Sequence, residues 1–213
     1  MKQESVKRIA VIGAGGFGRE VYHLWRDMLF VAQVPFEFVG FFDDNEDVLI
    51  SSGKIEDLNT INFPLEVVIA IGNTKHIQSV KNRLCNDNLL FPNIIHPSAQ
   101  FFDRSSILLG EGNIFAMNSI VSCNVKIGSF NIFNTRVTLG HDVVLGDFNV
   151  LSPNVQLSGG VRVGNENFFG FNSGVIQQKK IGNKNTIGAG AILLRHIKDE
   201  GTYLGNPAIK LTF

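Results

Sequence analysis

The sequence contains an adjacent pair of side chains, His141 and Asp142, whose types suit proton transfer. The unperturbed pKa of histidine, about 6.5, lets an imidazole accept a proton near neutral pH. A neighbouring carboxylate can orient the ring and stabilise its charged form. The pair follows Leu139, one of a series of apolar residues spaced six apart, so both polar side chains are expected on the outside of the fold or at a corner. An exposed histidine without catalytic function is the alternative interpretation.

A glycine-rich stretch near the start of the chain, GAGGFG from Gly13 to Gly18, is a second candidate site. It lies between a short apolar run and a helical pattern, and the amides at a helix N-terminus favour an anion. In a complete Rossmann domain, the G-x-G-x-x-G spacing suggests NAD. Only about ninety residues are available here, too few for two mononucleotide-binding halves. Two interpretations other than NAD binding remain: the turn binds the diphosphate of a nucleotide-sugar, or it is a tight strand-to-helix turn without a ligand.

Polar residues also follow two further apolar runs, residues 36–42 and 66–71. In open α/β sheets, ligands bind outside the carboxyl ends of the strands. Carboxylates there can accept hydrogen bonds from ribose hydroxyls or a base N–H, and a lysine can face a phosphate. A solvated acidic turn and an exposed lysine are the alternative interpretations. The residues concerned are Asp43 and Asp44 after the first run, and Gly72, Asn73 and Lys75 after the second.

The elements that carry these residues alternate between strand and helix. Apolar runs at 8–12, 36–42 and 66–71 predict strands, and residues 93–95 are a possible fourth. Helical spacing predicts a helix between the first two strands and another from residue 77 to 84. Alternating strands and helices predict a parallel sheet covered by helices. The apolar face of the first helix comprises Val21, Leu24, Trp25, Met28 and Leu29.

The second part of the chain has a different period, because an apolar residue occupies every sixth position from Leu109 to Leu193. Glycine and asparagine recur every 18 residues on top of this pattern, so three hexads form one coil. This spacing predicts a parallel β-helix of about five coils with apolar residues inside and Gly or Asn at the corners. Coils stack at about 4.8 Å, so the asparagine column is expected to form a hydrogen-bonded ladder. The column consists of Asn113, Asn131, Asn149, Asn167 and Asn185.

Composition limits the classes of function. The chain has 19 basic and 19 acidic residues, which argues against a nucleic-acid or anionic-membrane binder. No apolar stretch is long enough for a membrane span, and no secretory signal pattern is seen, so a cytoplasmic location is expected. Cys85 and Cys123 suggest neither a disulfide framework nor a metal cluster, and both are expected to be buried.

The chain resembles the bacterial nucleotide-sugar N-acetyltransferases of the left-handed β-helix superfamily. It is similar to the UDP-4-amino-sugar and GDP-perosamine acetyltransferases, and the sialic-acid O-acetyltransferase group shares the layout. The resemblance implies an α/β domain at residues 1–96 that binds the nucleotide-sugar. It also implies a left-handed β-helix acyltransferase domain at 97–213 with a C-terminal cap. The stretches that carry it are VIGAGGFGREV, FFDD, VIAIGN, IIHPSA, NTRVTLGHD, FFGFNSGV and GTYLGNPAIK.

The resemblance also implies a homotrimer with active sites between subunits and acetyl-CoA as the acetyl donor, without a metal. His141 would be the general base for direct transfer, and Asp142 would assist it through the turn or act on a neighbour's histidine, because adjacent side chains on a strand diverge. Val150 lies where a relative has a second histidine. The implied nucleotide-sugar contacts are Gly15, Gly16, Phe17, Asp43, Asp44, Gly72, Asn73, Lys75 and Asn134. The implied acetyl-CoA contacts are Val150, Phe171 and Ala189.

Other functions remain compatible with the sequence. An imidazole base could equally serve O-acetylation of a sugar hydroxyl, as in the sialic-acid group. A β-helix can also be a non-catalytic trimeric scaffold. An NAD-dependent enzyme is a third alternative, which would require binding of the nicotinamide cofactor.

Overall fold

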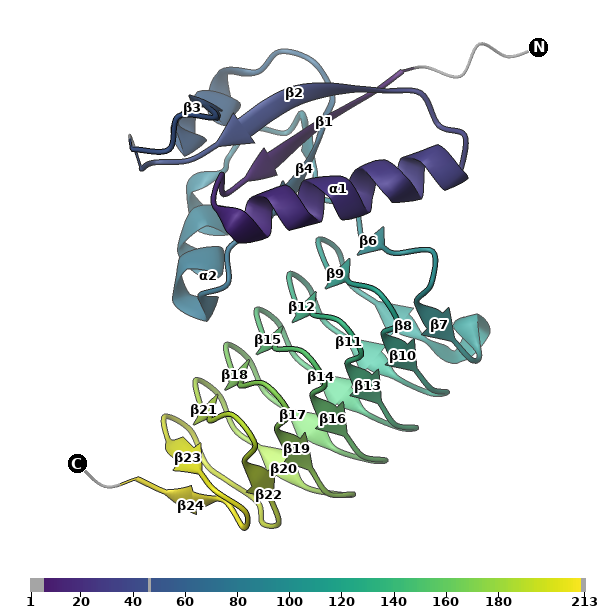
Figure 1. The fold of residues 1–213 in the computed structure, drawn as a ribbon, viewed down its shortest axis with the longest axis vertical. Coiled ribbons are helices and arrows are strands. Elements are labelled where there is room, and N and C mark those ends of the chain that lie inside the picture. Colours follow the sequence, from purple (N-terminus) through teal and green to yellow (C-terminus); the bar gives the residue numbers. More distant parts are fainter. Residues whose placement is uncertain (1–5, 46, 212–213) are drawn as a thin grey trace. The chain divides into compact units, whose positions relative to one another are not determined.

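The computed structural model describes residues 6–45 and 47–211, and the chain divides into two compact units, Met1–Pro97 and Ser98–Phe213 (Figure 1). The first unit contains a five-stranded sheet in the order β3-β2-β1-β4-β5, and its strand pairs are all parallel. The strands are β1 Lys7–Ile12, β2 Phe36–Phe42, β3 Ser51–Gly53, β4 Leu65–Ile69 and β5 Leu89–Leu90; β6, Ile94–Ile95, follows them.

Two α-helices pack against this sheet. Helix α1, Gly16–Val31, begins directly after the glycine-rich turn and buries Val21, Trp25 and Leu29, as its apolar spacing predicted. Leu24 and Met28 flank that buried stripe and are only half-buried. Helix α2, Thr74–Arg83, buries Ile77 and Val80, and a short 3₁₀ helix, η1, spans Ile55–Thr60.

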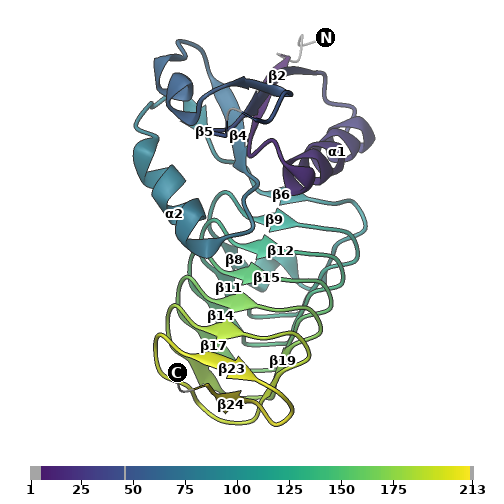
Figure 2. The same cartoon turned by 60° about the vertical axis from the view of Figure 1, so that its left-hand side comes forward.

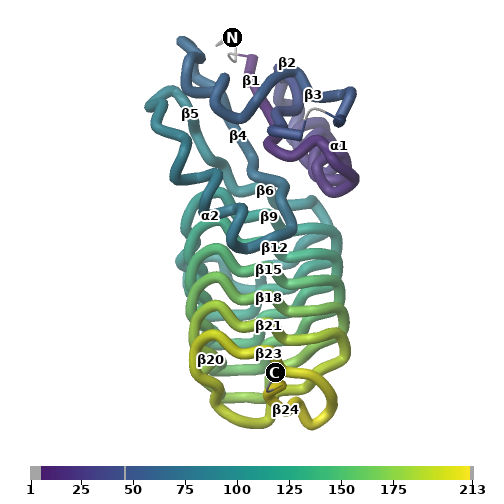
Figure 3. The backbone as a smooth tube through the Cα atoms, turned by 90° about the vertical axis from the view of Figure 1, so that its left-hand side faces the viewer, coloured from purple at the N-terminus to yellow at the C-terminus, as the bar shows by residue number. Residues whose placement is uncertain are grey.

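The second unit is a left-handed parallel β-helix whose short strands, two residues long except for β23, stack into three sheets (Figures 2 and 3). The β13 sheet contains β7 Gln100–Phe101, β10 Ile120–Val121, β13 Thr138–Leu139, β16 Gln156–Leu157, β19 Gly174–Val175 and β22 Ile192–Leu193. The β14 sheet contains β8 Leu108–Leu109, β11 Lys126–Ile127, β14 Val144–Leu145, β17 Arg162–Val163 and β20 Lys180–Ile181. The β15 sheet contains β9 Ile114–Phe115, β12 Ile132–Phe133, β15 Val150–Leu151, β18 Phe168–Phe169, β21 Thr186–Ile187, β23 Thr202–Leu204 and β24 Ile209–Lys210. A 3₁₀ turn, η2, lies at Arg104–Ser106.

The sixfold apolar series fills the interior of this β-helix. Each of its members is the second residue of a strand, and all from Phe115 to Leu193 are buried, whereas Leu109 at the first coil is half-buried. Phe115 and Phe133 stack with ring centroids 4.2 Å apart, which shows how equivalent positions meet in successive coils. At the far end, β24 runs antiparallel to β23 after the turn through Pro207 and ends the stack.

The corners of the coils depart from the sequence expectation. Glycine and asparagine were expected there, yet Phe130, Arg136, Phe148 and Lys184 also adopt left-handed backbone angles, with φ between 56° and 61°. Such a conformation costs about 1–2 kcal/mol for a residue with a Cβ. Each of these residues donates its backbone N–H to the preceding coil, for example Arg136 to the Met117 carbonyl at 3.0 Å, so coil stacking imposes the angle.

The asparagine column forms the predicted ladder. All five members are at most 1% exposed. In each step from Asn113 to Asn185, the backbone and side-chain amides donate to the side-chain oxygen of the asparagine 18 residues earlier, at 2.8–3.1 Å. These buried bonds fix the vertical register of the coils.

Candidate active site

His141 and Asp142 form the corner that follows β13. Asp142 has φ +60° and donates its backbone N–H to the Cys123 carbonyl of the preceding coil at 3.0 Å. In this left-handed turn, the two side chains do not diverge as they would on a strand. Instead, His141 Nδ1 lies 2.7 Å from Asp142 Oδ2 within the same chain.

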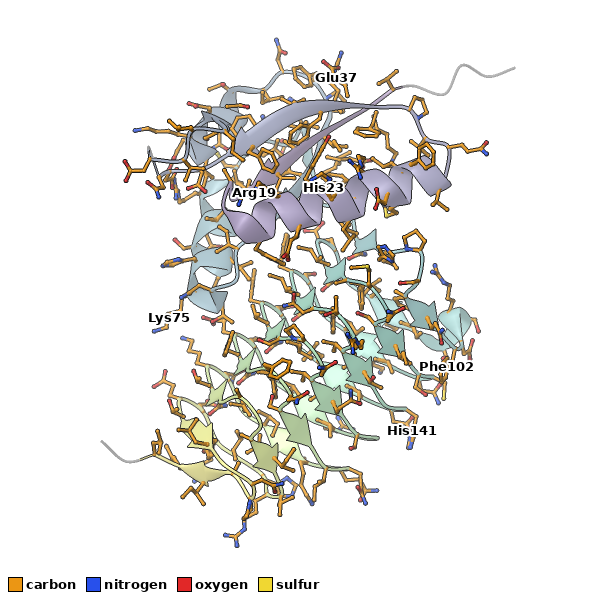
Figure 4. The ribbon with its side chains drawn as sticks, in the orientation of Figure 1. Arg19, His23, Glu37, Lys75, Phe102 and His141 are labelled. Carbon is orange, nitrogen blue, oxygen red and sulfur yellow. The ribbon has the colours of Figure 1, made fainter. Side chains whose placement is uncertain are left out.

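The electrostatics of this pair fix the role of each ring nitrogen. The hydrogen bond with His141 is the main cause that lowers the pKa of the Asp142 carboxyl, and the Asn124 side chain acts in the same direction. Asp142 is therefore ionised near neutral pH and can only accept hydrogen bonds, so Nδ1 carries the hydrogen. Nε2 of the neutral ring is then left as a proton acceptor. The His141 side chain is 66% exposed and projects from the edge of the β-helix (Figure 4).

Phe171 and Ala189, two of the residues expected at the acetyl donor, lie on another edge together with Asn134, an expected nucleotide-sugar contact. Asn134 is half-buried at the corner before β13, whereas His141 lies at the corner after it. Phe171 and Ala189 are exposed and occupy equivalent corners in later coils, and the Phe171 carbonyl accepts the Gly190 N–H at 2.8 Å. We call the corners of His141 and its equivalents the His141 edge, and those of Asn134, Phe171 and Ala189 the Asn134 edge. One chain does not bring the two edges together.

Val150 lies on neither edge. It is the first residue of β15, in a different sheet from Thr138–Leu139, and its side chain is only 3% exposed. Within one chain, the structure therefore does not place Val150 beside His141.

The glycine-rich stretch forms a tight turn between strand β1 and helix α1. Gly13 has φ +99°, and a Cβ on Gly18 would overlap the Gly13 carbonyl oxygen at 1.8 Å, so both positions require glycine. Gly15 and Gly16 are exposed, and Gly15 is the N-cap residue of α1. Because Gly15 has no side chain, the first amides of α1 are left without a side-chain cap. Phe17 is half-buried in the first turn of the helix.

Asp43 and Asp44 have partners within the protein. Asp43 accepts the N–H groups of Ala14 at 2.8 Å and Asn45 at 2.9 Å, which ties the glycine-rich turn to the end of β2. Asp44 accepts the Ile55 N–H at 3.2 Å and a bond from Arg83 at 2.7 Å.

Arg83, at the end of α2, is a residue of this site that the sequence did not indicate. It pairs with both Asp44 and Glu56, and the hydrogen bond from Arg83 is the main cause that lowers the pKa of the Asp44 carboxyl. Together with Asp43, His76 and Ser79, Arg83 lines a cavity of about 450 Å³. Its partners are distant in sequence, so no local pattern could have revealed the cluster.

The residues after β4 have a visible structural role. Asn73 is the N-cap of α2, and its side-chain oxygen accepts the N–H groups of Lys75 at 3.1 Å and His76 at 3.2 Å. Gly72 and Lys75 are exposed, and Figure 4 shows Lys75 projecting from the start of the helix. An asparagine directly before a helical pattern is a strong N-cap signal. Asn73 was predicted from the sequence to contact a ligand, and this capping role was not predicted.

Residues 6–45 and 47–211 contain neither a cluster of metal-binding side chains nor a helix able to span a membrane. Within these ranges, no group of three or more His, Cys, Asp or Glu residues could hold a metal ion. No helix there is both long and apolar enough to cross a membrane. The expectation for the cysteines was wrong, because Cys85 is exposed and Cys123, at the equivalent corner of the coil before His141, is only partly buried.

Known proteins share both units of this chain. Residues 8–84 match the family model described as PglD N-terminal domain. The acetyltransferase domain of PglB from Neisseria gonorrhoeae FA1090 is 30% identical, with a TM-score of 0.86 over 96% of this chain and 100% of that chain. PerB from Caulobacter crescentus, solved in complex with CoA and GDP-perosamine, is 27% identical, with a TM-score of 0.81 over 98% and 99% of the two chains. Comparison with curated protein sequences found no match.

Fold and sequence together place the protein among the acyltransferases built on a left-handed β-helix. More narrowly, the chain belongs to the nucleotide-sugar acetyltransferase family that combines a PglD-type N-terminal domain with this β-helix.

Proposed function

We propose that the protein transfers an acetyl group from acetyl-CoA to the amino group of a nucleotide-linked amino sugar, with His141 as the general base. The observation that carries this proposal is the His141–Asp142 pair, in which Nδ1 of an exposed imidazole lies 2.7 Å from a carboxylate oxygen. The PglB domain has been solved with acetyl coenzyme A, and PerB with CoA and GDP-perosamine, which supports the choice of both substrates.

The chemistry follows from the available groups. The neutral sugar amine attacks the thioester carbonyl, and its nitrogen becomes cationic as the C–N bond forms. Nε2 of His141 takes the proton from that nitrogen, and Asp142 stabilises the resulting imidazolium. The tetrahedral intermediate collapses with cleavage of the C–S bond, and the imidazolium returns the proton to the departing sulfur. The thioester is already activated, so no acyl-enzyme intermediate is required.

The binding regions are assigned by position. We assign the nucleotide-sugar to the first domain, residues 1–96, where the amides at Gly15, Gly16 and Phe17 suit the diphosphate. Asp43, Asp44, Gly72, Asn73 and Lys75 surround the neighbouring strand ends, and Asp43 and Asp44 line the cavity beside Arg83.

We assign acetyl-CoA to the Asn134 edge, with contacts from Phe171 and Ala189. A homotrimer would bring this edge of one chain to the His141 edge of the next, and residues 97–213 would then form the acyltransferase domain. We assign Asn134, on the same edge, to the nucleotide-sugar, and Val150 to acetyl-CoA.

The test is His141→Ala, with His23→Ala as the matched control because His23 is an exposed histidine on α1. Removal of a general base is expected to lower kcat by about 10²–10⁴-fold, while the control keeps the activity of the original protein. Sedimentation should show the same assembly for all three proteins. Undiminished turnover by the His141 variant would rule out the mechanism.

The acceptor is tested by giving the purified enzyme acetyl-CoA with UDP-, dTDP- or GDP-linked amino sugars, and in parallel with sialic acid. Acetylation of an amino sugar alone is the expected result. Turnover of sialic acid alone would replace the proposal with O-acetylation.

A further inference from the structure

The imidazole of His141 rests on a residue that has no side chain. Gly159 lies 18 residues after His141, at the same corner of the next coil. A Cβ on Gly159 would lie 2.5 Å from Nε2, 2.6 Å from Cε1 and 3.0 Å from Cδ2 of the His141 ring. Ordinary van der Waals contact begins at about 3.4 Å, so an alanine here must push the ring away.

Backbone conformation does not explain this glycine. Gly160, the next residue, has φ +67° and favours glycine for that reason, but Gly159 lies outside the left-handed region. The atoms nearest to the missing Cβ all belong to the His141 ring. The absence of a side chain at position 159 is therefore matched to the ring.

The two coils are also fixed relative to each other at this point. The Gly160 N–H donates to the His141 carbonyl at 2.8 Å, so the backbone of His141 cannot retreat from a methyl group below it. A Cβ on Gly140 would approach the Gly159 nitrogen to 2.7 Å, which shows how closely the corners stack. The ring itself must rotate to relieve the contact, and rotation disrupts the 2.7 Å bond to Asp142.

We propose that Gly159 is a positioning residue for the reaction. Because Gly159 has no side chain, the His141 ring can pack directly against its Cα while Nδ1 stays hydrogen-bonded to Asp142. The inference rests on the proposed function of His141 as the base. Displacement of Nε2 by about 1 Å is enough to cost roughly 10²-fold in rate when the reacting groups are otherwise aligned.

The kinetic test compares Gly159→Ala with Lys184→Ala, an exposed residue at the corner between the β14 and β15 sheets, which belongs to neither edge. We expect kcat of Gly159→Ala to fall about 10- to 100-fold, and that of the Lys184 variant to stay unchanged. In the Asp142→Ala background the ring is already released, so the alanine at 159 should then add little. A methyl group that merely blocked substrate would lower kcat by the same factor in both backgrounds, and this outcome, or an undiminished kcat, would overturn the proposal.

A double-mutant cycle of melting temperatures tests the contact between Gly159 and the His141 ring without an activity measurement. His141→Ala is expected to raise the melting temperature of the Gly159→Ala chain more than it raises that of the original protein, because only in the Gly159→Ala chain does the ring meet a methyl group. If the single variant does not fold and the double variant does, the proposal is supported. If His141→Ala changes the melting temperature equally in both chains, the glycine serves the backbone and the proposal fails. Should His141→Ala remain active, the proposed function fails while this cycle still reports on the contact.

Discussion

Substitution of Asn149 by alanine tests whether the asparagine ladder holds the coil that carries His141. The Asn149 side chain donates to the Gly164 carbonyl at 3.0 Å and the Asp147 carbonyl at 3.2 Å. Its oxygen accepts the Asn167 backbone N–H at 2.9 Å, and the whole residue is 0% exposed. Alanine keeps the backbone N–H of Asn149, which still donates to Asn131.

The magnitude follows from the groups left without a partner. Truncation removes the acceptor of the Asn167 backbone N–H and the side-chain donor to the Gly164 carbonyl. A buried polar group left unsatisfied costs about 1–3 kcal/mol, so the two together cost about 2–6 kcal/mol. The vacated volume is that of a small amide, and a single water entering it would move the loss toward the lower end. Even that is a large share of the roughly 5–15 kcal/mol that stabilises a typical protein.

Asn165 provides the matched control at the equivalent corner of the next coil. Its side-chain oxygen also accepts a backbone N–H, from Asp147 at 2.8 Å, but Asn165 is exposed and water can replace it. Asn165→Ala is therefore expected to cost about 0.5 kcal/mol or less. Urea unfolding followed by circular dichroism measures both losses, and equal slopes show that the transitions are comparable. Equal destabilisation by the two substitutions would refute the argument that burial gives the ladder its strength.

Three further predictions concern the first domain and the Asn134 edge. Arg83→Gln should lower the melting temperature at pH 6. The difference should disappear as pH falls through the pKa values of Asp44 and Glu56, below their usual values of about 3.9 and 4.3, because Arg83 lowers both pKa values and its contribution needs the ionised carboxyls. Asn73→Ala should destabilise α2 by about 1 kcal/mol in thermal unfolding, and Asn73→Asp should not, because aspartate also caps a helix; equal losses would exclude the capping role. Phe171→Ala should change stability by less than about 0.5 kcal/mol, since the side chain is 51% exposed, but raise the KM for acetyl-CoA; an unchanged KM would remove Phe171 from the donor site.

The β-helix was predictable from sequence because each of its contacts repeats at a fixed separation. An apolar residue such as Leu139 packs between equivalents 18 residues away in either direction, so one period specifies the interior. The asparagine ladder follows from the same period. Strands β1, β2 and β4 were also predicted, because each is a short, strongly apolar run. β3 and β5 were not predicted, because Ser51–Gly53 and Leu89–Leu90 are too short and too mixed to give a strand pattern.

Contacts that depend on one dihedral angle or on distant residues were out of reach of the sequence. The His141–Asp142 bond requires φ +60° at Asp142, and the sequence marked only a corner there. The Arg83 cluster joins three separate segments, so no spacing reveals it. The capping role of Asn73 could have been predicted, because asparagine is a preferred N-cap residue and Asn73 directly precedes the helix.

The separation of the two edges has a consequence for how the enzyme can work. Strand β13 separates the corner of Asn134 from the corner of His141, and the coil-to-coil register repeats this separation along the whole sheet. No rearrangement of side chains can close the gap, because the corners are fixed by backbone hydrogen bonds in every coil. If the donor lies along the Asn134 edge, the base that serves it must come from another chain. One chain then holds two halves of different sites, and the proposed reaction requires assembly for catalysis itself as well as for stability.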